Sequence, residues 1–309
     1  GMIGAGIFVL TGIAAGVAGP ALVLVFLLNG LVTTLTAMSY AELGSAFPEA
    51  GGGYLWVKEG LGGAQGFLAG WMSWFAHGAA GSLYALAFGR FATELWTMAN
   101  LPTLGFSIAQ LTLGFMTLII VGFTILNYLG ASETGSVGNI VTLTKVGILG
   151  LFVLFGILAM LRTDAWVTRF TTGFLPNGPL SIVVAMGLTF IAFEGYEIIA
   201  QSGEEAIDPK RNIPRAIFGA IAIAVTIYLL VSITAIGATV APEGMRAYEY
   251  LGEKKEVAII EVAQQVFPWA IGGLVLLFSG LVSTMSALNA TTYSSSRVAF
   301  AMGRDHNLP

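Results

Sequence analysis

The first 41 residues of the chain, GMIGAGIFVLTGIAAGVAGPALVLVFLLNGLVTTLTAMSYA (1–41), contain no charged side chain. About 20 consecutive apolar residues are enough to cross the hydrocarbon core of a bilayer as an α-helix. The stretch is therefore long enough for two crossings. Gly19 and Pro20 mark the natural turn between them, because both residue types interrupt helices. The opening of the sequence thus predicts a pair of membrane-spanning helices.

The same pattern continues along the chain. Charged residues make up 10% and apolar residues 56% of the 309 residues, whereas soluble domains carry about 25% charged residues. The sequence therefore predicts an all-α polytopic membrane protein, and it excludes a soluble enzyme, a disordered protein and a nucleic-acid-binding protein. The further charge-free runs are continuously apolar, which disfavours barrel strands; they lie at 60–89, 95–132, 146–161, 170–193, 216–242 and 262–296.

Eight spans account for these runs. All ten prolines fall at the proposed boundaries, so a helix broken inside the membrane is expected to be broken by glycine. The distribution of Lys and Arg favours an extracellular position for residues 242–268, where we expect a short amphipathic helix in a Glu- and Lys-rich loop. The predicted spans are about 1–19, 21–46, 66–96, 105–129, 136–161, 179–204, 214–241 and 269–302.

Composition also limits the chemistry. The chain has no cysteine, which excludes disulfides, thiolate nucleophiles and Cys-based zinc sites. His77 and His306 are its two histidines, too few for a His-built metal site. We therefore expect no metal and no cofactor. An intramembrane enzyme would need a nucleophile–base pair, and the residues near His77 carry no such motif, so we do not expect an enzyme.

Three ionisable residues lie inside the predicted spans, namely Lys145, Glu194 and Glu197. Such residues are costly in hydrocarbon and usually face a cavity or a partner. Alternatively, each lies nearer a helix end and reaches the interface with its long side chain. His77 could relay protons, although a hydrogen-bonded packing role is the simpler interpretation. The eighth span also carries polar residues that either line an ion site or bond back to their own helix: Ser283, Thr284, Ser286 and Asn289.

Two glycine-rich breaks carry the functional prediction. They read IGAGIF (3–8) and AFEGY (192–196), and they fall in the first and sixth spans, which correspond if two five-span halves repeat. Transporters with inverted repeats bind substrate at interrupted helices near the bilayer midplane. Free N–H groups at a half-helix start attract an anion, and unwound carbonyls accept a cation. Such a site suits an α-amino acid zwitterion.

With these features, the chain resembles the amino acid–polyamine–organocation permeases, in particular their cationic-amino-acid-transporter-like and prokaryotic branch. The resemblance implies two inverted five-helix repeats with broken first and sixth spans. Residues 1–161 would form the first repeat and 162–309 part of the second. Only spans one to eight are expected here, as in a fragment that lacks the start of span one and the later spans. The stretches that carry it are GMIGAGIF (1–8), YAELGSAFPEAGGGYLW (40–56), FIAFEGYEIIAQSGEEAIDPKRNIPRAI (190–217) and SSSRVAFAMGRDHNLP (294–309).

The resemblance also implies roles for individual residues in substrate binding. The backbone of the first break would hold the substrate carboxylate and part of its amine, and the carbonyls of the second break would complete the amine site. Phe193 would act as a gate. Because an acidic residue is found at the position of Glu194 in members of different specificity, it does not predict the substrate. The implied substrate-binding residues are Ile3, Gly4, Ala5, Gly6, Ala192, Phe193, Glu194 and Gly195.

Coupling and gating roles are implied in the same way. Lys145 matches a fifth-span lysine that takes the place of a sodium ion in proton-coupled and exchanging members, where it bridges the first and eighth spans. Ser283 or Ser286 would be its eighth-span neighbour. Glu204 and Glu205 match an acidic cytoplasmic link, to which we assign conformational control.

We therefore expect a secondary transporter that takes up amino acids by alternating access across the plasma membrane, with the proton as coupling ion. One alternative is an amino acid or amino acid/polyamine exchanger without net proton flux, and another is an amino acid sensor that does not transport. The expected partners are a small amino acid and the lipid bilayer, without nucleic acid or an obligatory protein partner.

Overall fold

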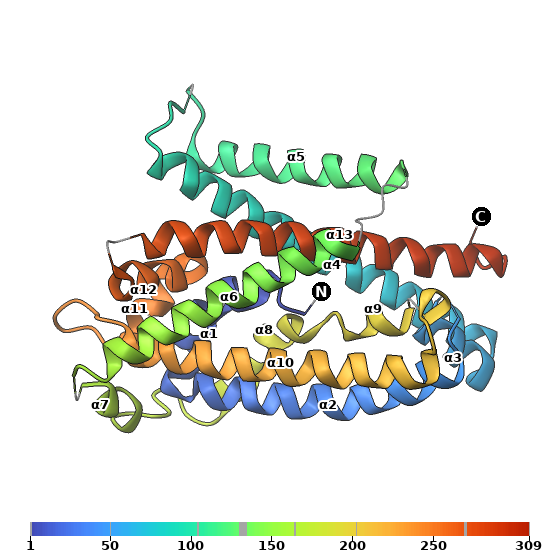
Figure 1. Cartoon of the computed structure of the whole chain (residues 1–309), viewed down its shortest axis with the longest axis horizontal. Coiled ribbons are helices and arrows are strands. Elements are labelled where there is room, and N and C mark those ends of the chain that lie inside the picture. Colours follow the sequence, from blue (N-terminus) through green and yellow to red (C-terminus); the bar gives the residue numbers. More distant parts are fainter. Residues whose placement is uncertain are drawn as a thin grey trace.

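The computed structural model describes residues 2–49, 51–103, 105–129, 135–163, 165–201, 203–268 and 271–308. Throughout these ranges every regular element is a helix (Figure 1), which confirms the predicted all-α class. Within the described ranges, six helical segments are long and apolar enough to cross a membrane, so the chain is a multi-pass membrane protein. They are Ala5–Ala46, Ile108–Tyr128, Asn139–Met160, Leu180–Gln201, Pro209–Ala238 and Gly272–Arg304.

The first of these segments contains the predicted pair of spans. Helix α1 (Ala5–Ala18) is followed by the turn η1 (Gly19–Ala21) and helix α2 (Leu22–Ala46). Gly19 has a φ of 66°, a backbone conformation that glycine adopts without a steric penalty. The predicted break at this position is therefore confirmed.

The third and fourth predicted spans form α4 and α5. A short helix, α3 (Gly53–Leu61), precedes α4 (Gly63–Met98). At 36 residues α4 is about 54 Å long, but small and polar residues lower its hydropathy and it is not among the six segments above. Helix α5 (Ile108–Tyr128) starts with a capping box formed by Ser107 and Gln110, which satisfies two backbone donors that the helix itself leaves free.

The sixth predicted span is interrupted. The fifth span forms α6 (Gly135–Met160), and a short helix α7 (Ala165–Thr171) follows it. The sixth span then divides into pieces, in contrast to the continuous helices around it. These pieces are α8 (Leu180–Thr189), the 3-10 turn η2 (Phe190–Phe193), α9 (Tyr196–Gln201) and the turn η3 (Gly203–Glu205).

The last part of the chain differs from expectation in two details. Helix α10 (Pro209–Ala238) begins five residues before the predicted start at 214, so Pro214 lies inside the helix rather than at its boundary. Residues 242–268 form two short helices instead of one, because Lys255 takes a φ of 48° between them. The elements are α11 (Ala247–Lys254), η4 (Lys255–Val257), α12 (Ala258–Val266) and finally α13 (Gly272–Arg304).

Close helix approaches build the core. Helix α2 runs beside α10 along one side of the molecule, and α13 crosses α4, while α5 lies outermost (Figure 1). Glycines permit these approaches: a Cβ on Gly30 would lie 2.7 Å from the side chain of Val225, and one on Gly16 would lie 2.8 Å from the Cα of Gly252. Both pairs of long helices, α2 with α10 and α4 with α13, join one helix from residues 1–161 to one from 162–309. The division into two repeats itself stays a prediction.

Candidate functional site

The first break lies at the start of α1. Met2 to Gly4 are not helical, and Gly4 precedes the helix with an extended backbone (φ −111°, ψ −150°). Ala5 and Gly6, which we expected in the unwound stretch, lie in the first turn instead. At the start of a helix the first amide N–H groups have no intrahelical hydrogen-bond partner, and those of Ala5 and Gly6 are among them. The break therefore presents free donors at the positive end of the α1 dipole.

The second break lies where the sequence places it. After η2 the backbone of Glu194 is extended, with φ −64° and ψ 152°, and Gly195 takes a φ of 119°. L-amino acids with a side chain rarely adopt the latter value. The N–H of Gly195 donates to Oε2 of Glu197 at 2.8 Å. Glycine is thus favoured at the interruption between η2 and α9, where the Glu197 carboxylate accepts from its peptide N–H.

The two breaks are in direct contact. A Cβ on Gly6 would lie 2.5 Å from Cβ and 2.6 Å from Cα of Ala192, so only glycine at position 6 permits this approach. Tyr228 of α10 joins the two segments, because its Oη lies 2.6 Å from the carbonyl oxygen of Met2 and 2.7 Å from that of Ala192. One hydroxyl proton serves two acceptors, and it can be donated to one of them at a time.

Tyr228 is a site residue that sequence reasoning missed. The only available signal is a phenol in the middle of the charge-free run 216–242, since a buried tyrosine hydroxyl usually has a hydrogen-bond partner. Phe193, the predicted gate, packs edge-on against the ring of Tyr228 with centroids 5.1 Å apart, and Phe26 of α2 completes the cluster. Phe193 is fully buried in this conformation.

Lys145 of α6 reaches the first break. Its side chain is 3% exposed, and its Nζ donates to the carbonyl oxygen of Ile3 at 3.2 Å. Ser283 of α13 is fully buried, and its hydroxyl has no hydrogen-bond partner within the described ranges, whereas Ser286 is half-buried. The structure therefore places Lys145 against the first span. Its predicted bridge to either serine stays a prediction.

Glu194 lines two hollows beside the second break. One has a volume of about 370 Å³ and is walled by α2, α4 and α9, with Tyr40 and His77 among its lining residues. The other has about 10 Å³ and lies between the break, Tyr84 and Thr291. This smaller volume is about the space that one water molecule needs. The gap between the break, α4 and α13 must therefore widen to admit an amino acid from that side.

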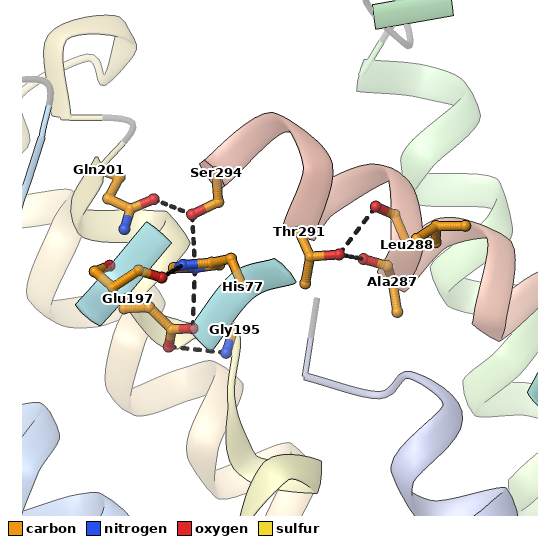
Figure 2. Close-up of polar contacts among 9 residues, drawn as sticks. His77, Gly195, Glu197, Gln201, Ala287, Leu288, Thr291 and Ser294 are labelled. Atoms are coloured by element: carbon orange, nitrogen blue, oxygen red, sulfur yellow. Dashed lines mark hydrogen bonds and ion pairs between the residues drawn. The ribbon is translucent and has the colours of Figure 1, made fainter. Parts of the chain in front are cut away.

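A buried polar cluster lies beside Glu197 (Figure 2). His77 of α4 places Nδ1 2.7 Å from the carbonyl oxygen of Ser73 and Nε2 2.8 Å from Oγ of Ser294. The Ser294 hydroxyl donates to Oε1 of Gln201. Oε1 of Glu197 lies 3.9 Å from Nε2 of His77. The hydrogen-bonded environment expected for His77 is confirmed, and it joins α4, α9 and α13.

The predicted gating residues follow α9. Glu204 is exposed, and the side chain of Glu205 lies outside the described part. Gly203 lies against the end of the second span, where an added Cβ would be 2.9 Å from Cα of Pro48. Within the described ranges no three His, Asp or Glu side chains are close enough to hold a metal ion.

The end of α13 is fastened to α3 close to this link. Lys58 and Asp305 form an ion pair of 2.7 Å, and Tyr54 donates to the same Asp305 oxygen at 2.7 Å. The hydrogen bond from Lys58, followed by the one from Tyr54, holds the pKa of Asp305 below its usual range. Stretches that are far apart in the sequence, 40–56 and 294–309, therefore meet here.

Comparison with known proteins identifies relatives of the chain. A family model described as amino acid permease matches residues 1–309. An uncharacterized protein of Methanocaldococcus jannaschii is 30% identical over 311 residues, covering 100% of this chain and 66% of that protein. The methylthioribose transporter of Bacillus subtilis is 29% identical over 321 residues, with 100% and 65% covered. The branched-chain amino acid permease BcaP of Bacillus subtilis is 28% identical over 318 residues, again with 100% and 65% covered. The chain thus spans about two thirds of the length of these relatives.

Proposed function

Because the chain belongs to the amino acid permease family, we propose that it forms the substrate-binding part of a secondary amino acid transporter that works by alternating access in the plasma membrane. The resemblance found in the sequence is confirmed at the level of the family. The choice of substrate, the coupling ion and the membrane belong to the proposal.

The contact between the two breaks supports an amino acid as the substrate. The first turn of α1 offers free N–H groups, which favour a carboxylate at a helix start. The carbonyl oxygens of Met2, Ile3 and Ala192 are gathered beside it by Tyr228 and Lys145, and such oxygens favour an ammonium group. An α-amino acid carries both groups on one carbon, so one small site satisfies both sets.

A ligand screen tests this assignment. Purified protein is heated in the presence of each of the twenty amino acids, common polyamines and methylthioribose, because a ligand that binds only the folded protein raises its midpoint of unfolding. We expect at least one α-amino acid to raise the midpoint, and the same compound to accumulate in proteoliposomes. Stabilisation by methylthioribose alone would contradict the zwitterion argument, because that sugar lacks both charged groups.

Proton coupling rests on Lys145. An ammonium group that is 3% exposed and donates to the first break changes that contact when it loses its proton. Protonation and the conformation of the break are then linked, as binding equilibria at two sites must be. Uptake driven by an inward proton gradient, compared with counterflow after the gradient is collapsed, separates proton-coupled uptake from exchange. Counterflow without any gradient-driven uptake would favour the exchanger.

A further inference from the structure

The hydrogen bonds around His77 match a doubly protonated ring, with the Gln201 amide oriented as in this structure. Ser73 contributes a backbone carbonyl, which can only accept, so Nδ1 of His77 carries a proton. The single proton of the Ser294 hydroxyl is donated to Oε1 of Gln201, so Ser294 offers a lone pair to Nε2 at 2.8 Å. Nε2 then carries a proton as well. With the Gln201 amide in this orientation, every contact is satisfied by the doubly protonated imidazolium.

The surroundings supply the counter-charge. Oε1 of Glu197 lies 3.9 Å from Nε2, and Glu194 lines the same cavity. The other titratable groups there are the phenols of Tyr40 and Tyr196, while Tyr84 lines the smaller hollow that Glu194 also borders. Along α13 the next cation, Arg297, donates to Tyr293. Among the described lining residues, two carboxylates therefore share one base, His77.

We propose that His77, with Glu197 as its counter-ion, is a proton-binding site that holds the second break in the conformation seen here. This inference rests on the proposed transport function. The two oxygens of Glu197 have different tasks: Oε1 faces the imidazole of α4, and Oε2 accepts from the peptide of Gly195 at 2.8 Å. One carboxylate thus links the charge on α4 to the backbone that adjoins the proposed substrate site.

Loss of the proton changes both links. A bare Nε2 needs a donor, so the Ser294 hydroxyl turns towards it and Oε1 of Gln201 loses its hydrogen bond. Glu197 loses its opposite charge at the same time. Helix α9 is then released from α4 and from α13, on which Ser294 lies. The conformation seen here binds the proton more tightly than a conformation without these contacts, so lower pH favours it. If substrate binds the same conformation, proton binding strengthens substrate binding, and substrate strengthens proton binding by an equal factor.

Nitrogen NMR of the two histidines tests the site without requiring a known substrate. The protein is labelled with 15N-histidine, reconstituted in lipid nanodiscs and titrated between pH 5 and pH 9. His306 is exposed with a φ of 58°, and His306→Asn serves as the matched control because asparagine tolerates this conformation. We expect both His77 nitrogens to show imidazolium shifts at pH 6. Glu197→Gln removes the counter-charge and keeps the shape of the side chain, so it is expected to weaken the imidazolium signal of His77 at pH 6.

Transport supplies the second readout. The pH profile of uptake, measured with the amino acid that gives the largest thermal stabilisation, is expected to flatten in His77→Gln and in Ser294→Ala and to stay unchanged in His306→Asn. Ser294→Ala removes only a hydroxyl, so it keeps the test informative if His77→Gln does not fold. A His77 that stays neutral with its proton on Nδ1 down to pH 5 would overturn the inference, even in an active transporter. Absence of uptake for all amino acids would overturn the transport proposal instead, and the NMR result would still decide on His77.

Discussion

Replacing Gly6 with alanine is expected to force the two breaks apart. The new Cβ would lie 2.5 Å from Cβ and 2.6 Å from Cα of Ala192, whereas carbon atoms in contact are about 3.5–4.0 Å apart. The segments must therefore separate by roughly 1 Å, and overpacking of this kind costs about 1–3 kcal/mol. If the whole cost falls on the arrangement that binds substrate, affinity drops by about 5- to 150-fold.

The matched control is Gly219→Ala in α10. No atom lies within 4 Å of a Cβ at that position, so alanine there is expected to leave binding unchanged and to stabilise the helix by up to about 1 kcal/mol. Both variants are compared by thermal unfolding in detergent and by titration with the amino acid found in the screen. The double variant Gly6→Ala/Ala192→Gly should not recover, because the contact with the Cα of residue 192 remains. Equal midpoints and equal affinities for Gly6→Ala and Gly219→Ala would refute the close contact of the two breaks.

Three further predictions follow from single contacts. Tyr228→Phe removes the donor shared by two buried carbonyls and should destabilise the protein by about 1–3 kcal/mol, whereas Tyr128→Phe, at a residue 90% exposed, should leave the unfolding midpoint unchanged. Lys145→Met keeps the apolar length but loses the charge and the hydrogen bond to Ile3, so uptake driven by a proton gradient should be lost; undiminished gradient-driven uptake would contradict the coupling role. Interactions with its bonded partners lower the pKa of Asp305, so it contributes stability above its unfolded pKa of about 4. This contribution falls as pH drops below that value and is lost below the folded pKa. Melting curves of Asp305→Asn and the unsubstituted protein should therefore differ near neutral pH and converge only well below about pH 4.

Hydropathy and glycine placement predicted the spans well because both act locally. A charge-free run must leave water whatever its neighbours are, and most predicted span ends lie within four residues of the observed helices. Glycine at 195 marks the second break because the chain there takes a backbone conformation that other residues rarely adopt. Helix α10 starts before the predicted boundary at Pro214. Its other proline, Pro209, occupies the first turn, where the missing N–H of proline costs no hydrogen bond.

The contacts that assemble the site were not predictable in the same way. Ser294 and His77 are 217 positions apart, and Lys145 and Ile3 are 142 apart. Whether such pairs meet depends on how each helix is rotated about its axis, which a nearly uniform apolar sequence does not specify. The role of Tyr228 is not predictable for the same reason. Its neighbours in the sequence are apolar, and its two acceptors belong to the distant breaks.

Two unbroken helices, α10 and α6, donate to backbone carbonyls of the breaks, and a third, α4, faces the side chain of Glu197. These contacts differ in what a conformational change requires. The hydroxyl of Tyr228 on α10 can turn its hydrogen bond from the carbonyl oxygen of Met2 to that of Ala192. Tyr228 can therefore stay bonded to either break without a change of charge. Lys145 on α6 donates from a charged ammonium group, and His77 on α4, in the doubly protonated form proposed above, donates to Ser294. Movement of the breaks that ends these two contacts leaves charges unmatched in an apolar interior, which is costly unless a proton leaves. Proton coupling is therefore expected to depend on Lys145 and His77. It should persist in Tyr228→Phe, although the folded protein is less stable in that variant.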